Sequence, residues 1–149
     1  MTSPAQQAQL VELFTSEGCS SCPPADRWLS SLKGQPELFR SVVPVAYHVT
    51  YWDYLGWEDT LGLAAHDQRH RRQAAFAGSG VYTPGVFRQG KEWRSWRRHS
   101  RGMMPAGARS VGELTARGAD GRITVSFTPE PGVKVLSPEV FVTFLRMDQ

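Results

Sequence analysis

The sequence predicts an α/β fold in which helices flank a central mixed sheet, and three observations support this prediction. Apolar strand patterns and helical patterns alternate up to residue 96 in the order β-α-β-α-β-β. The chain's two cysteines, Cys19 and Cys22, come directly after the first strand pattern and open the first helical pattern. The last two strand patterns are separated by a short turn, so they should form an antiparallel hairpin. The first two strands should be parallel, with a right-handed crossover.

The first half of this pattern is strong. Residues 10–15 form an apolar run that predicts a buried strand. Residues 22–33 predict a helix, because their apolar residues recur at i, i+3, i+4 and i+7, and Gly34 ends it. Residues 42–49 predict a second strand, in which Pro44 cannot donate a ladder hydrogen bond and should lie near the strand's start.

The second half of the pattern completes the sheet. Residues 51–59 are an aromatic-rich loop, and residues 61–77 predict a second helix. Residues 85–88 predict a short strand, the turn follows at 89–91, and residues 92–96 should return as the hairpin partner. No closing helix is expected after this hairpin.

The remaining residues predict a β-rich extension. We expect one domain over residues 1–100 and the extension over residues 101–149. Within the extension, alternation predicts strands at 110–117, 121–128 and 139–147.

Composition and charge narrow the class of protein. The chain has 149 residues, of which 40% are hydrophobic and 21% charged, as in a globular protein with a real core. No apolar run approaches the ~18 residues of a membrane span. Residues 1–9 show no signal peptide, so the chain as given predicts a cytoplasmic protein, or a periplasmic or secreted one if a signal was removed.

One basic segment accounts for most of the net charge of +3. Its tryptophans, Trp93 and Trp96, could stack on nucleic-acid bases, but we expect them to pack on the core instead, so no nucleic-acid partner is predicted. The basic residues of the segment are Arg88, Lys91, Arg94, Arg97, Arg98 and Arg101.

The cysteine spacing indicates thiol–disulfide exchange. A C-x-x-C at a strand-to-helix turn places both thiols at one site. Cys19, at the positive end of the helix dipole, should be the nucleophile, and Cys22 should resolve the mixed disulfide. The partner would be a protein or small-molecule thiol or disulfide, and no cofactor is predicted. An inert or structural cysteine pair is the alternative.

Three motifs in order resemble a bacterial thioredoxin-like family of unassigned function, domain of unknown function twelve-twenty-three. They are residues 12–26 (ELFTSEGCSSCPPAD), residues 48–57 (HVTYWDYLGW) and residues 81–84 (VYTP). The resemblance implies a thioredoxin-like fold without implying a substrate. The chain departs from thioredoxins proper, which carry an aromatic residue where this chain has Gly18.

The resemblance also implies roles for residues outside the cysteine motif. Thr83-Pro84 is the expected cis-proline loop, which would face the cysteines and dock an extended partner through the Thr83 backbone. Glu12 could be the buried acid that helps to deprotonate Cys22, or it could reach solvent at the edge of the strand. Tyr51 and Trp52 could shape a substrate groove, although core packing is the preferred interpretation.

A non-catalytic binding module is the alternative function. His66 and His70 have the i, i+4 spacing of two metal ligands and could complete a zinc site with the cysteines, although about forty residues separate the two pairs. The cysteines alone could hold copper(I), because soft thiolates select it. We predict no metal ligands, and a protein partner is the other possible occupant of such a module.

Overall fold

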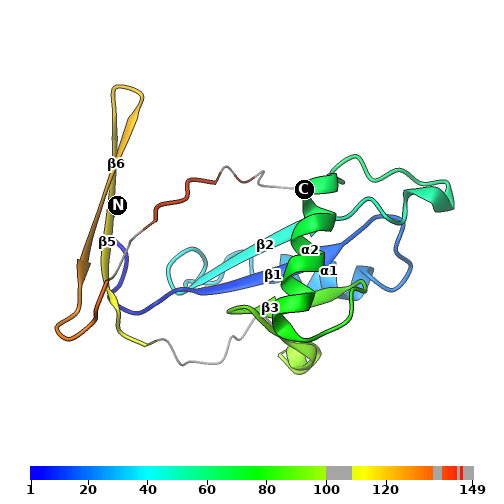
Figure 1. Cartoon of the computed structure of the whole chain (residues 1–149), viewed down its shortest axis with the longest axis horizontal. Helices are drawn as coiled ribbons and strands as arrows, with labels where there is room; N and C mark the ends of the chain where they lie inside the picture. Colours follow the sequence, from blue (N-terminus) through cyan, green and yellow to red (C-terminus); the bar gives the residue numbers. More distant parts are fainter. Residues whose placement is uncertain (100–108, 136–138, 144, 146–149) are drawn as a thin grey trace. The chain divides into compact units, whose positions relative to one another are not determined.

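The computed structural model describes residues 1–99, 109–135, 139–143 and 145, and the chain divides into two compact units (Figure 1). One unit comprises Gln9–Pro105 and contains the cysteine pair. The other combines Met1–Ala8 with Ala106–Gln149.

The cysteine-bearing unit is built on a four-stranded mixed sheet with the order β2-β1-β3-β4. The central strand β1 (Gln9–Thr15) pairs in parallel with β2 (Val42–His48) and antiparallel with β3 (Gly85–Arg88). Pro44 lies on the edge strand β2, where its missing N–H group leaves the pairing with β1 intact.

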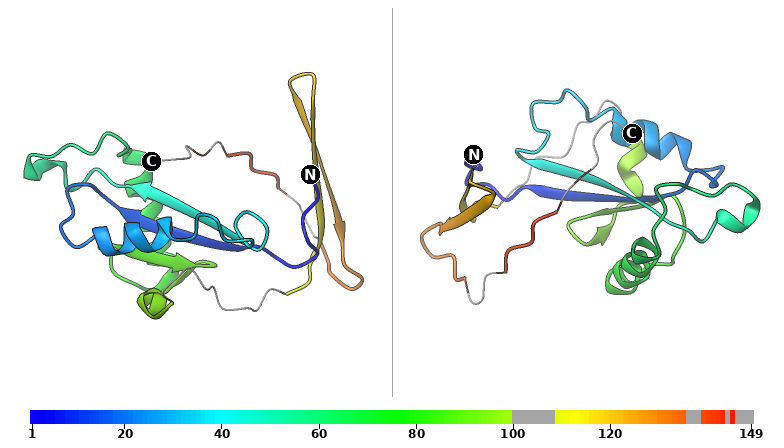
Figure 2. Two further views of the ribbon diagram at one scale, coloured as in Figure 1. Left: turned by 180° about the vertical axis from the view of Figure 1, so that it is seen from behind. Right: turned by 90° about the horizontal axis from the view of Figure 1, so that it is seen from above.

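Two helices cover opposite faces of this sheet, as Figure 2 shows. Helix α1 (Pro23–Ser30) packs against the side chains of Val11 and Leu13. Helix α2 (Ala64–Ala77) packs against the face that carries Phe14, because successive side chains of β1 point to opposite faces. The predicted fold class is therefore confirmed: a mixed sheet flanked by helices, consistent with a thioredoxin-like fold.

The end of this unit differs from the prediction. The hairpin partner of β3 is only β4 (Lys91–Glu92), and a 3₁₀-helix, η2 (Arg94–Arg98), replaces the rest of the strand predicted over 92–96. The reason is core packing. Trp93 and Trp96 are both buried, and three-residue spacing places them on one side of a 3₁₀ turn. The tryptophans of the basic segment therefore pack in the core, as expected.

The second unit is organised around one antiparallel hairpin of β5 (Gly112–Ala119) and β6 (Arg122–Pro129). The N-terminal segment belongs to this unit, since Thr2 bridges to Thr115 and Gln6 to Ser110. The strands predicted at 110–117 and 121–128 are confirmed with small shifts of their ends.

The prediction of a strand at 139–147 is wrong for the residues that the structure describes there. Residues 139–143 and 145 are not in a strand, and the other three residues lie outside the described part of the chain. Alternation produces a strand only where a neighbour supplies ladder hydrogen bonds, and the described parts of β5 and β6 pair with each other. None of the helices in the described part of the chain is long and apolar enough to cross a bilayer.

Candidate functional site

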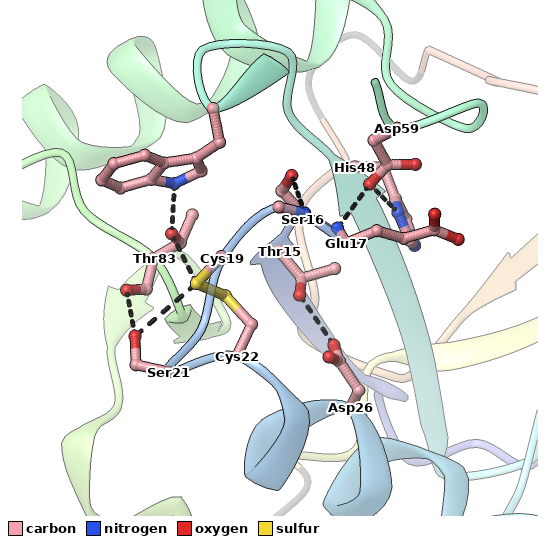
Figure 3. The surroundings of a disulfide bond; sticks show 12 residues. Thr15, Ser16, Glu17, Cys19, Ser21, Cys22, Asp26, His48, Asp59 and Thr83 are labelled. Carbon is pink, nitrogen blue, oxygen red and sulfur yellow. Dashed lines mark hydrogen bonds and ion pairs between the residues drawn. A yellow bond between two sulfur atoms is a disulfide. The ribbon is translucent and has the colours of Figure 1, made fainter. Parts of the chain in front are cut away.

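Cys19 and Cys22 form a disulfide at the N-terminus of α1, with their sulfurs 2.13 Å apart (Figure 3). The turn is held by its own backbone, because the Cys19 N–H donates to the Ser16 carbonyl and the Cys22 N–H to the Cys19 carbonyl. Cys22 is the N-cap residue of α1, and Pro23 and Pro24 begin the helix, where their missing N–H groups cost no intrahelical bond. Cys19 is 6% exposed and Cys22 is fully buried, so a partner can reach the site only through Cys19.

The Thr83-Pro84 loop lies against Cys19, the more accessible of the two cysteines, and its peptide bond is cis. The Thr83 hydroxyl donates to Cys19 Sγ at 3.2 Å. Ser21 connects the cysteine turn to the same loop, since its hydroxyl donates to the Thr83 carbonyl at 3.4 Å and lies 3.6 Å from Cys19 Sγ. The structure thus brings the two cysteines and the predicted cis-proline loop together.

The aromatic loop supplies the next contact. The indole Nε1 of Trp52 donates to Thr83 Oγ1 at 2.7 Å, so Thr83 accepts one hydrogen bond while it donates another to the sulfur. Tyr51 is half-buried and its hydroxyl lies 3.1 Å from His70 Nδ1. Burial raises the pKa of Tyr51 to about 12, so the phenol is neutral at physiological pH. Tyr51 and Trp52 also pack against the buried cluster around Phe14, which is the interpretation preferred from the sequence.

Gly18, where thioredoxins proper carry an aromatic residue, lies beside the aromatic loop. A Cβ atom at this position would lie 3.4 Å from Trp52 Cβ and 3.5 Å from the carbonyl oxygens of Trp52 and Trp57. The 51–59 loop therefore lies directly over the residue before Cys19, and a methyl group there would make ordinary van der Waals contacts with it.

A buried carboxylate fixes this loop to the cysteine turn. Asp59 Oδ2 accepts a hydrogen bond from the Glu17 N–H (2.8 Å) and lies 2.7 Å from His48 Nδ1, and its Oδ1 accepts from the Leu61 N–H (2.9 Å). Burial by itself would raise the pKa of Asp59, but these hydrogen bonds outweigh it and hold the pKa below its ordinary value. No local pattern indicates this role of Asp59, because its partners Glu17 and His48 are distant in the chain.

Glu12 lies on the other side of the sheet. Its side chain is 2% exposed and accepts two hydrogen bonds from Arg69 of α2, at 2.5 and 2.9 Å. The helix that begins at Cys22 packs on the opposite face, against Val11 and Leu13. The structure therefore does not bring Glu12 to the cysteine pair. We expected Glu12 either behind the thiols or at a solvent-exposed edge of the strand, and it lies in neither place.

Asp26 is the carboxylate that shares a helix face with Cys22, four residues further along α1. It accepts a hydrogen bond from the Thr15 hydroxyl at 2.7 Å (Figure 3). Burial raises the pKa of Asp26, against the lowering effect of this hydrogen bond. The i, i+4 spacing from Cys22 could have indicated this residue, but an acid in a first helical turn is also favoured by the helix dipole alone.

Residues 10–141 match the family described as "Protein of unknown function (DUF1223)". The chain belongs to this family. A crystal structure of protein AGR_C_4864 from Agrobacterium tumefaciens is similar to this DUF1223 chain, with 31% sequence identity and a TM-score of 0.59. The match covers 82% of this chain and 57% of the Agrobacterium protein. No protein of curated function matches the chain.

The two histidines considered as metal ligands have other partners in this DUF1223 protein. His66 Nδ1 lies 2.8 Å from the carbonyl oxygen of His48. His70 is fully buried, its ring stacks on Phe14 at 4.1 Å, and burial lowers the pKa of His70 to about 4. Within the described ranges no group of three or more His, Cys, Asp or Glu residues is placed to hold a metal ion.

Proposed function

We propose that this protein exchanges a dithiol for a disulfide with a protein or small-molecule partner, with Cys19 as the attacking sulfur and Cys22 as the resolving one. The observation that carries the proposal is the asymmetry of the pair. Both sulfurs occupy one helix N-terminus, but only Cys19 is accessible, and only Cys19 receives the Thr83 hydroxyl.

The two cysteines supply all the electrons that one round of exchange requires. The Cys19 thiolate attacks one sulfur of the partner's disulfide, which forms a mixed disulfide and releases the other sulfur as a thiolate. The Cys22 thiolate then attacks Cys19 Sγ, reforms the intramolecular disulfide and releases the second partner thiolate. Two electrons pass from the cysteine pair to the partner, and the reverse sequence oxidises a partner dithiol.

The groups around Cys19 favour its negative form. The N-terminus of α1 contributes its dipole, worth ~0.3–1 kcal/mol for a nearby anion. The Thr83 hydroxyl contributes a hydrogen bond, and a bond to a charged acceptor is worth ~1.5–3 kcal/mol. The Trp52 indole orients that hydroxyl, because its own donation occupies the Thr83 oxygen from the other side.

The buried sulfur needs a proton acceptor before it can resolve the intermediate. Asp26 suits this role, since it lies one helical turn from Cys22 and burial raises its pKa. Asp26 therefore replaces Glu12 in the proposed mechanism. Thr83 and Pro84 would dock the backbone of an extended partner, with Tyr51 and Trp52 beside it.

The charges predict that the pair is a reductant. Among the described residues, the side chains that contact Cys19 Sγ through hydrogen bonds are the neutral hydroxyls of Ser21 and Thr83. Asp26, one helical turn from Cys22, is a carboxylate, and its negative charge opposes a thiolate there. The disulfide form should thus be favoured over the dithiol form more than it is in strongly oxidising proteins. We expect a reduction potential nearer to the about −270 mV of thioredoxin than to the about −120 mV of the strongest oxidants.

A redox titration against glutathione tests the proposal. The wild-type protein should equilibrate reversibly, and Cys22→Ser should accumulate a mixed disulfide at Cys19 that Cys19→Ser cannot form. The pre-reduced wild type should reduce one equivalent of the small neutral disulfide bis(2-hydroxyethyl) disulfide to 2-mercaptoethanol, whereas Cys22→Ser should stop at the mixed disulfide and Cys19→Ser should not react. A cysteine pair that never equilibrates with glutathione would refute the exchange reaction and favour the alternative of a non-catalytic binding module. Metal analysis of protein purified without chelator would then test whether that module holds a metal.

A further inference from the structure

An aromatic groove lies beside the accessible cysteine. It has a volume of about 410 Å³, within the range of small-ligand sites. The 51–59 loop, helix α2 and the segment before the cis-proline each contribute to its wall. The lining residues are Tyr51, Trp52, Tyr54, Arg71, Val81 and Tyr82.

The groove is continuous with the exchange site. Trp52 lines it and also donates the hydrogen bond to Thr83 that leads to Cys19 Sγ. Val81 and Tyr82 directly precede Thr83 in the chain. A partner whose cysteine reaches Cys19 and whose backbone lies along Thr83 therefore extends its next residues into the groove, since an extended chain advances ~3.3 Å per residue.

The walls and the rim of the groove have different chemistry. The Trp52 and Tyr54 rings stack at 6.3 Å, and the Tyr54 side chain remains 76% exposed, although it is aromatic. Large exposed aromatic surfaces are typical of recognition sites, because they bury much apolar area at a low cost in side-chain entropy. The walls thus suit an aromatic or aliphatic side chain.

Arg71 supplies one positive charge to the groove. Its side chain is exposed and has no hydrogen-bond or ion-pair partner among the described residues. The acid one helical turn before it, Asp67, is committed elsewhere, since it accepts two hydrogen bonds from Thr50, each 2.8 Å long. The guanidinium is therefore free to pair with a carboxylate of the occupant.

We infer that the groove binds an extended polypeptide segment of a partner protein that carries an aromatic side chain and a carboxylate within about three residues of its reacting cysteine. This inference rests on the proposed exchange, whose substrate class it names. Four aromatic side chains against one cation favour such a segment over a small, highly charged thiol such as glutathione.

The test compares synthetic peptides whose single cysteine carries a thionitrobenzoate leaving group, so that attack by reduced protein releases colour. Each peptide has Phe near the cysteine and Glu, Gln or Lys next to the Phe. Two sets of peptides are made, one with these two residues before the cysteine and one with them after it. Rates are divided by the rate with bis(2-hydroxyethyl) disulfide. Wild-type protein should prefer Glu to Gln and Gln to Lys, each by roughly two- to five-fold, as for an exposed ion pair.

Arg71→Glu should invert this order, whereas Arg72→Glu, the same charge change at the next exposed residue outside the groove, should keep it. Tyr54→Ala should lower the normalised rate for every Phe peptide by about ten-fold. Equal rates for the three peptides with wild-type protein, or inversion by Arg72→Glu as well, would overturn the inference.

A binding measurement separates the two proposals. Peptides with Ser in place of the cysteine are titrated into the full chain while tryptophan fluorescence is recorded. Charge-selective binding without any exchange would support the groove and refute the exchange reaction. Reduction of bis(2-hydroxyethyl) disulfide without peptide selectivity would support the exchange and refute the groove.

Discussion

Replacing Asp59 by asparagine should lower the stability of the cysteine-bearing unit. The carboxylate accepts from Glu17 N–H and His48 on one oxygen and from Leu61 N–H on the other. An asparagine offers one acceptor oxygen in place of two. Whichever way its amide is turned, the N–H of Glu17 or of Leu61 loses its acceptor. An unpaired buried donor costs ~1–3 kcal/mol, so the free energy of unfolding should fall by that amount at pH 7.

The difference should depend on pH in one direction. The folded pKa of Asp59 lies below its ordinary value of 3.8. Its carboxylate therefore contributes stability that is complete above about pH 4 and is lost as the pH falls through the folded pKa. Urea unfolding followed by tryptophan fluorescence, repeated from pH 7 downward, should show the wild type and Asp59→Asn converging in acid.

Glu58→Gln is the matched control, because it makes the same change of charge one residue earlier on an exposed side chain. It should stay within about 0.5 kcal/mol of the wild type at every pH. If Asp59→Asn were as stable as Glu58→Gln at pH 7, or if its deficit did not shrink in acid, the account of Asp59 as the residue that fixes the cysteine turn would be wrong.

Three further predictions concern the interior. Asp26→Asn should slow resolution of the mixed disulfide by at least about ten-fold in stopped-flow assays. Glu12→Gln should leave resolution unchanged but cost ~1–3 kcal/mol in urea unfolding, because Arg69 loses its charged hydrogen-bond acceptor. Gly85→Ala should destabilise by ~1–3 kcal/mol, since the new Cβ would lie 2.8 Å from a carbonyl oxygen, whereas at Gly80 the nearest atom is 3.8 Å away and Gly80→Ala should be tolerated. The His70 ring should titrate near pH 4 by NMR, and because this pKa lies below the ordinary 6.5, stability should fall by about 3 kcal/mol from pH 6.5 to pH 4.

The backbone plan of the cysteine-bearing unit could be predicted because each element has a local signal. The run at 10–15 and the helical spacing of Ala25 and Trp28 identify β1 and α1 before any tertiary contact is known. Trp93 shows the limit of such signals. The turn at 89–91 predicted a returning strand that would continue past this residue, but burial of two tryptophans turned the chain into η2.

The polar groups of the site were harder to predict than its sulfurs. Cys19 and Cys22 are three positions apart in the sequence, so spacing alone reveals them. Glu12 and Asp26 are both acids near the motif, and only the side of the sheet on which each lies distinguishes them: Glu12 contacts Arg69, 57 residues away. Such pairings depend on which helix covers which face of β1, and this information is not local.

The placement of polar groups divides the proposed chemistry between the two sulfurs. Cys19 is the more accessible sulfur, and the hydroxyls that contact it can stabilise its negative charge. Cys22 is fully buried, and Asp26, one helical turn away, is the proposed acceptor of its proton. A thiolate at Cys22 is costly until the mixed disulfide removes the charge from Cys19. The order of the two steps therefore follows from burial: the exposed sulfur attacks first, and the inner sulfur is deprotonated only when there is a bond for it to break.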